Sequence, residues 1–136
     1  SHGQNGVGDT NHRKKAAHVK TTTGQDLTDV KSLHPANGDR YGSLCVLKND
    51  ATVWCWGYNN HGQVGTGNTQ QRDAAQQVVG ITDIAGVENP YMIDHSYAYH
   101  TVCAHNTLAA GGYVWCWGYN NYGQLGVGDT SERYSP

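Results

Sequence analysis

Short apolar stretches separated by Gly, Asn and Asp recur along the chain and predict short strands joined by tight turns. No window shows a sustained 3.6-residue apolar period, so helices are expected to be minor. The stretches form two sets in the same order, Ala17–Val19, Leu27–Val30 and Leu44–Leu47, then Gln77–Val79, Ile81–Ile84 and Thr101–Ala104. A Trp-Cys-Trp segment follows each set, so each unit contains four strand candidates.

The chain also contains an internal repeat. The segment Trp54–Gln63 recurs 61 positions later as Trp115–Gln124. The phrase Gly62–Thr69 returns as Gly123–Thr130, and a version of it opens the chain as Gly3–Thr10, 59 positions earlier. Four short strands in each repeat are typical of a propeller blade. We therefore predict an all-β fold of four-stranded antiparallel β-propeller blades, about two blades plus partial ones. An irregular β-sandwich with two similar halves is the alternative.

In this interpretation residues 1–136 form a partial propeller. Repeat one covers residues 1–59 and enters mid-repeat, repeat two covers 60–120, and repeat three starts within 121–136. Gly65 and Gly67 are expected to supply positive φ in the loop that links one blade to the next.

The phrase Gly-Gln-Leu-Gly-x-Gly-Asp-Thr, together with Cys-Trp-Gly-x-Asn, resembles the regulator of chromosome condensation repeat family. The resemblance covers essentially the whole chain and implies blades from a seven-bladed propeller, here of the bacterial or extracellular type. The periods of 59 and 61 residues exceed that family's usual repeat, so enlarged loops are expected. Because two periods cannot close a seven-bladed ring, we expect a fragment of a longer chain. Self-assembly of copies into a ring or filament is the alternative.

The four cysteines are spaced as one pair per repeat. A three-residue loop at Asn49–Ala51 would place Cys45 directly opposite Cys55 in an antiparallel hairpin, and Cys103 and Cys116 occupy equivalent positions. We predict the disulfides Cys45–Cys55 and Cys103–Cys116. Reduced buried thiols are the alternative, and the close Cys spacing of zinc sites is missing. Paired cysteines indicate an oxidising compartment, so an extracellular or cell-surface location is expected.

The repeated phrases also supply the residues expected to pack and connect blades. These residues are Trp54, Trp56, Trp115, Trp117, Gly57, Gly118, Gln63 and Gln124. The two Trp of each segment point to one face of a strand and suit the contact between adjacent sheets, and each Gly ends a strand at a sharp turn. Each Gln is expected to bond to backbone groups of a neighbouring blade. A carbohydrate-stacking platform is the other interpretation of the Trp residues.

Composition and motifs exclude several classes of function. The formal net charge of −2 disfavours a nucleic-acid partner, and the absence of a long apolar stretch disfavours membrane insertion. No recognisable catalytic or phosphate-binding motif is present, and a single carboxylate per turn phrase is too few for calcium. His100 is interpreted as a hydrogen-bonding residue near the propeller core. We therefore predict a protein that is not an enzyme and that has no cofactor and no metal.

The function expected from these features is an extracellular or cell-surface binding or adhesion propeller, with a role in a surface assembly or filament. Its partner would be a protein, a surface glycan or copies of itself. Tyrosines in the enlarged loops suit such contacts, and the candidates are Tyr41, Tyr91, Tyr97 and Tyr99. The alternatives are a guanine-nucleotide exchange factor for a small GTPase and a secreted protein inhibitor of an enzyme.

Overall fold

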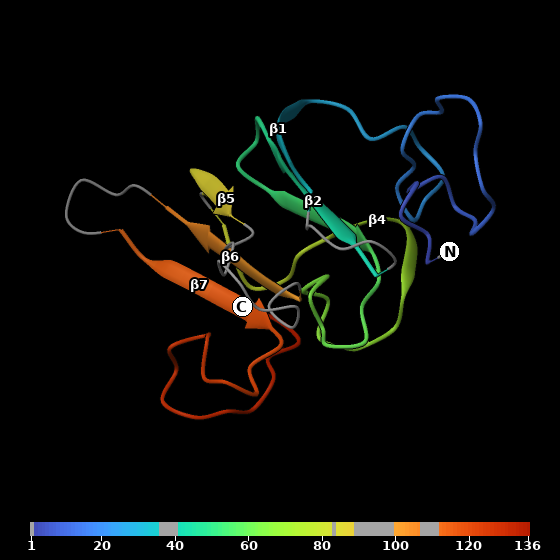
Figure 1. The fold of residues 1–136 in the computed structure, drawn as a ribbon. Coiled ribbons are helices and arrows are strands. Elements are labelled where there is room, and N and C mark those ends of the chain that lie inside the picture. Colours follow the sequence, from blue (N-terminus) through green and yellow to red (C-terminus); the bar gives the residue numbers. More distant parts are fainter. Residues whose placement is uncertain (1, 36–40, 83, 89–99, 107–111) are drawn as a thin grey trace.

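The computed structural model describes residues 2–35, 41–82, 84–88, 100–106 and 112–136, and its strands form two antiparallel sheets (Figure 1). The first sheet has the order β1-β2-β3-β4, with β1 Val30–Pro35, β2 Ser43–Lys48, β3 Val53–Gly57 and β4 Arg72–Gln77. The second has the order β5-β6-β7, with β5 Gly86–Glu88, β6 Thr101–His105 and β7 Val114–Gly118. We call these sheets the first and second blade. None of the described residues is helical, so the all-β prediction is confirmed.

The central hairpin of the first blade forms in the predicted register. Lys48 N donates to Thr52 O at 2.9 Å, and Ala51 takes a φ of 63° in the three-residue loop. Cys45 therefore lies opposite Cys55. In the second blade, Cys103 lies opposite Cys116 in the same way.

The outer strands differ from the prediction. The stretch Leu27–Val30 contributes only Val30, where β1 begins, and Asp29 before it takes a φ of 60°. Ala17–Val19 also lies outside the sheets, and Gln77–Val79 contributes only the last residue of β4. Both β1 and β4 are edge strands of the first blade, where β1 pairs with β2 and β4 pairs with β3. Their bounds follow from this backbone pairing rather than from an apolar sequence pattern.

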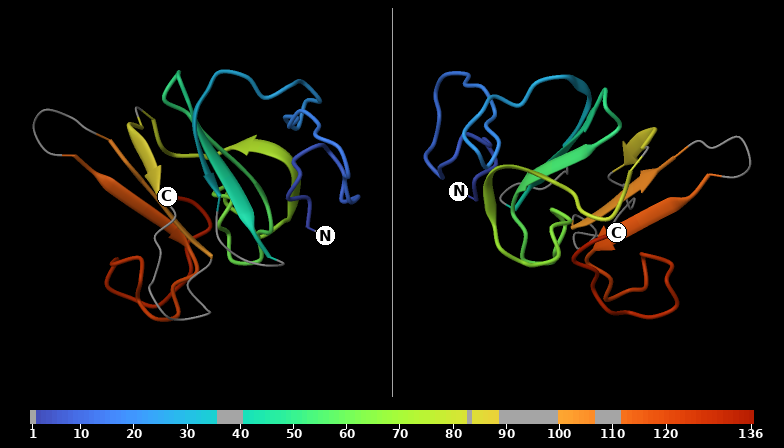
Figure 2. Two further views of the ribbon diagram at one scale, coloured as in Figure 1. Left: turned by 45° about the horizontal axis from the view of Figure 1, so that its top comes forward. Right: turned by 180° about the vertical axis from the view of Figure 1, so that it is seen from behind.

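The two blades lie side by side and share one core (Figure 2). On the first blade the core contains the face of β2 and β3 that carries Cys45 and Cys55, and on the second blade it contains Val102, Ala104 and Trp117. Burying about 200 Å² of an indole at about 25 cal/mol/Å² contributes about 5 kcal/mol of hydrophobic stabilisation. Trp117 is fully buried in this core, so its ring makes a contribution of about this size.

The turn phrase connects β3 to β4 within one sheet, and not one blade to the next as predicted. Gly65 and Gly67 have φ values of 75° and 77°, as expected. The connection still touches the following repeat, because Gly67 N donates to Tyr134 O at 2.8 Å. The phrase therefore closes its own sheet and also contacts the next blade.

A buried amide organises this connection. Asn59 is fully buried, and its Nδ2 donates to the carbonyls of Asn68 and Gln70 at 3.0 and 2.8 Å. Its Oδ1 accepts from Val64 N at 2.8 Å. Asn120 repeats these three bonds at 2.9 to 3.0 Å in the C-terminal loop, and it is equally buried.

Candidate binding surface

Both predicted disulfides form, and they lie in different environments. The Cys45–Cys55 bond joins β2 to β3, and both cysteines are buried in the core between the blades. The Cys103–Cys116 bond joins β6 to β7, and its cysteines are partly exposed. The disulfide predictions are therefore confirmed.

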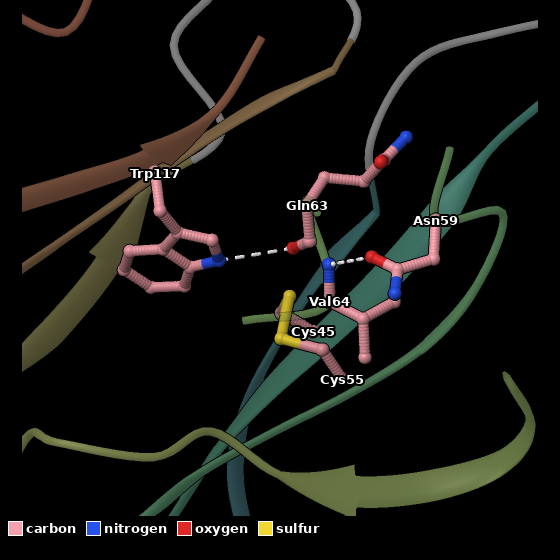
Figure 3. The surroundings of a disulfide bond; sticks show 6 residues. All are labelled: Cys45, Cys55, Asn59, Gln63, Val64 and Trp117. Carbon is pink, nitrogen blue, oxygen red and sulfur yellow. Dashed lines mark hydrogen bonds between the residues drawn. A yellow bond between two sulfur atoms is a disulfide. The ribbon is translucent and has the colours of Figure 1, made fainter. Parts of the chain in front are cut away.

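The second Trp of each Trp-Cys-Trp segment is buried and hydrogen-bonded to a preceding turn phrase. Trp117 Nε1 donates to Gln63 O at 3.0 Å, and Trp56 Nε1 donates to Gln4 O at 2.9 Å. Figure 3 shows the Trp117 indole pointing toward the Gln63 carbonyl, with Val64 and the disulfide of the first blade nearby. The first Trp of each segment, Trp54 or Trp115, is half-buried. It packs against the same apolar cluster as the second Trp of its segment.

The Gln side chains of the repeated phrase act differently from the prediction. Gln63 Oε1 accepts from the backbone N of His61, within its own loop, at 3.0 Å. Gln124 makes the equivalent bond to Tyr122 N at 3.1 Å. The link from Gln63 to the next blade is a side-chain contact of 3.1 Å between Nε2 and His100 Nδ1, so the neighbouring backbone is not its partner.

Gly57 and Gly118 end β3 and β7 with φ values of 102° and 101°. A Cβ on Gly57 would lie 2.7 Å from Gly42 O, and one on Gly118 would lie 2.0 Å from His100 O. Only glycine fits both the dihedral angle and the space. These tight turns carry the chain directly from the end of each strand into a cluster of aromatic rings.

The rings form a continuous row that crosses from the first blade to the second. We call it the Tyr-His row, and its members are His2, Tyr41, Tyr58, His61, His100, Tyr119 and Tyr122. Neighbouring ring centroids are 4.9 to 6.1 Å apart along the row. At its centre His61 stacks on His100 at 4.9 Å and meets Tyr119 edge to face at 5.0 Å. Rings from both blades therefore build one surface.

Hydrogen bonds fix the ring nitrogens at the centre of the row. Because Gln63 Oε1 already accepts from a backbone N–H, its Nε2 donates to His100 Nδ1, and the proton of neutral His100 lies on Nε2. His61 Nδ1 lies 2.6 Å from Glu132 Oε1, so it donates to the carboxylate. Neutral His61 therefore keeps Nε2 as a hydrogen-bond acceptor.

The repeat model described as the regulator of chromosome condensation (RCC1) repeat matches residues 50–87 and 111–136. The chain belongs to this repeat family. Its two sheets are accordingly β-propeller blades, as predicted.

Similar proteins support this family membership. The probable E3 ubiquitin-protein ligase HERC4 of Rattus norvegicus is 33% identical over 112 residues, which are 82% of this chain and 10% of that protein. The protein RCC2 homolog of Danio rerio is 26% identical over 106 residues, which are 78% of this chain and 20% of that protein. The human WBSCR16 crystal structure superimposes with a TM-score of 0.62 and 18% identity, covering 100% of this chain and 32% of the other. The chain thus spans a tenth to a third of the length of these relatives.

In this RCC1-repeat segment the Tyr-His row contains two groups with shifted pKa values, His100 and Tyr58. Burial, followed by the charge of His61, lowers the pKa of His100 from 6.5 to about 4. Burial, followed by the nearby Tyr41, raises the pKa of Tyr58. His100 and the Tyr58 hydroxyl are therefore uncharged near neutral pH. The prediction of a hydrogen-bonding His100 agrees with its contact to Gln63.

Of the predicted contact tyrosines, Tyr41 lies in the row and is 48% exposed. Tyr91, Tyr97 and Tyr99 lie outside the described residues. Sequence reasoning did not assign the other members of the row, or Glu132, to a contact surface. A signal was present, because Tyr58 and Tyr119 share one repeat position and His2, His61 and Tyr122 share another.

Within the described ranges, no group of three or more His, Cys, Asp or Glu residues is arranged to hold a metal ion. The same residues contain no helix with the length and apolar character needed to cross a membrane.

Proposed function

We propose that this propeller segment is a non-catalytic protein-binding module and that the Tyr-His row is part of its contact surface. The observation that carries the proposal is the row itself. Tyr41 is 48% exposed, whereas His61 and His100 are held by stacking and hydrogen bonds. Tyrosine provides large contact area at a low conformational-entropy cost, which suits protein interfaces.

The shape of the row favours a macromolecular partner over a small ligand. The apolar cavity beside the first blade is lined by Trp56, Leu44 and Leu33 among others, and no row residue lines it. The row is a strip along two blades, and a strip suits an extended contact. Propellers of this repeat family are generally non-catalytic, which agrees with a binding role. The ligase named for the Rattus norvegicus relative is that whole protein, so we propose only the binding role here.

We also propose an extracellular or cell-surface location. The two disulfides support it, because disulfides persist in oxidising compartments. The test is to alkylate the protein from its native source under denaturing conditions without reductant and to measure its mass. Unmodified cysteines are expected, and four alkylated cysteines would contradict the proposed location.

The binding role can be tested by site-specific photo-cross-linking. A benzophenone amino acid is placed at Tyr122 in one variant and at Tyr113 in a matched control, in the full chain. Tyr113 is 63% exposed but precedes β7, whereas Tyr122 follows it, so the two positions lie at opposite ends of the strand. A specific protein adduct is expected at position 122 and not at position 113. Equal adducts at both positions, or none at 122, would contradict the proposal.

A further inference from the structure

We propose that His61, Glu132 and the rings around them bind a lysine or arginine side chain of the partner protein. This inference rests on the protein-binding role proposed above and names the chemistry that the row recognises.

The first observation is the carboxylate at the centre of the row. Glu132 Oε1 lies 2.6 Å from His61 Nδ1, and the side chains of Glu132 and His61 are 21% and 27% exposed. Among the ion pairs of the described residues, His61 is the only partner of Glu132. The Glu132 carboxylate has further lone pairs beyond its one bond to His61, and a cationic N–H donor complements its negative charge.

The second observation is the aromatic environment of His61, the hydrogen-bond partner of that carboxylate. Tyr119 meets His61 edge to face at 5.0 Å, and Tyr58 lies 6.3 Å from His61. Tyrosine faces attract ammonium and guanidinium groups, and the attraction grows where solvent is partly excluded. A carboxylate bonded to a histidine that two tyrosine rings contact therefore favours a cation over an anion or an uncharged group.

The third observation is that, among the described residues, no lysine or arginine forms an ion pair with Glu132. Arg133, next to Glu132, bonds instead to Asp129 Oδ2 at 2.7 Å and to Ser131 O at 3.0 Å. His100 stacks on His61, but burial keeps its pKa at about 4, so it adds no positive charge near neutral pH. Within the part of the chain that the structure describes, no lysine or arginine therefore neutralises the Glu132 carboxylate.

The repeat supplies an internal control. His2 occupies the position equivalent to His61, and its Nδ1 lies 2.8 Å from Oε1 of Gln71, which is equivalent to Glu132. The same hydrogen bond therefore forms with an uncharged partner. Glu132→Gln should keep the local structure and remove only the charge, and Gln71→Glu should add a charge at the earlier position.

The test uses a capped peptide, Gly-Ser-Arg-Gly-Arg-Ser-Gly, and the same peptide with citrulline in place of arginine. Citrulline keeps the shape of the side chain and removes its charge. Binding to the full chain is measured by NMR titration at low salt, with the imidazole signals of His61 and His100 as the local readout. We expect the arginine peptide to bind about tenfold more tightly than the citrulline peptide. Glu132→Gln should abolish most of that difference, and Gln71→Glu should increase it.

Three results would each overturn the inference. The two peptides could bind equally, or the His61 signals could stay unshifted with millimolar arginine peptide. The Glu132→Gln variant could also still prefer the arginine peptide over the citrulline peptide as strongly as the unmodified chain does. Backbone NMR spectra of the variants show whether the fold is kept, and Gln71→Glu provides a gain that misfolding cannot imitate. If the cross-link at Tyr122 persists while arginine dependence fails, the binding role stands and only the cation preference is wrong.

Discussion

Replacing Asn59 with alanine should destabilise the protein far more than replacing its neighbour Asn60. Asn59 is fully buried and its side chain makes three hydrogen bonds to the backbone of the β3–β4 connection. Asn60 is exposed. The two substitutions delete the same atoms from adjacent positions, so their difference measures the buried hydrogen bonds.

The magnitude follows from the groups left unpaired. In Asn59→Ala two carbonyls and one N–H lose their partner, and each buried polar group without a partner costs about 1–3 kcal/mol. Water entering the space left by the amide satisfies part of this demand, so we take the lower end. The expected loss is about 3 kcal/mol, against less than about 0.5 kcal/mol for Asn60→Ala.

The assay is equilibrium urea unfolding of the full chain followed by tryptophan fluorescence. Asn59→Ala should lower the midpoint strongly with an unchanged m-value, because the denatured state is not altered. Asn59→Asp should be at least as damaging, since its carboxylate would face two carbonyl oxygens. If Asn59→Ala cost no more than Asn60→Ala, the buried amide would not be what holds the connection together.

Three further outcomes are expected from the same structure. Gly65→Ala should lower the free energy of unfolding by about 1–3 kcal/mol more than Gly67→Ala does. Both glycines have positive φ, but only a Cβ at position 65 would meet Trp117 Nε1, at 2.8 Å. Equal urea midpoints for the two variants would refute this prediction. The pKa of His100 in the folded chain is about 4, below its ordinary 6.5, so between these pH values the unfolded chain binds more protons than the folded chain. The free energy of unfolding should therefore fall by about 2 kcal/mol as the pH drops from about 6.5 to about 4. Calorimetry of His100→Gln should show a weaker pH dependence, and an unchanged one would refute that assignment. Limited reduction followed by alkylation and mass spectrometry should open the partly exposed β6–β7 disulfide before the buried β2–β3 disulfide, and the reverse order would be a contradiction.

Local chain geometry made the central hairpins predictable. The loop at Asn49–Ala51 sets the register of β2 and β3, and the register places Cys45 opposite Cys55. The repeat then transfers the same pairing to the second blade. The pairing of these strands can be read from residue spacing because each strand pairs with the next strand along the chain.

The edge strands were not predictable in the same way. In β1, Val30 and Leu33 are 42% and 57% exposed, so its apolar residues do not mark a buried face. In β4, the sequence Arg-Asp-Ala-Ala-Gln-Gln has no strand-like alternation, and pairing with β3 defines it. The Tyr-His row was hidden for a related reason. Its members come from loops that are far apart in sequence, and only the packing of two blades brings them together.

The differences between repeats separate structure from recognition. Positions that keep the same residue build the blade, as Asn59 and Asn120 do with three matching bonds and Trp56 and Trp117 do with matching indole bonds. Two positions that change lie in or beside the row: His2, His61 and Tyr122 are equivalent, as are Gln71 and Glu132. Each alternative is accommodated by the same backbone, so the fold does not require the residue that is present. The residue at these positions is therefore free to determine what the row binds, and the charge at position 132 is the strongest such difference.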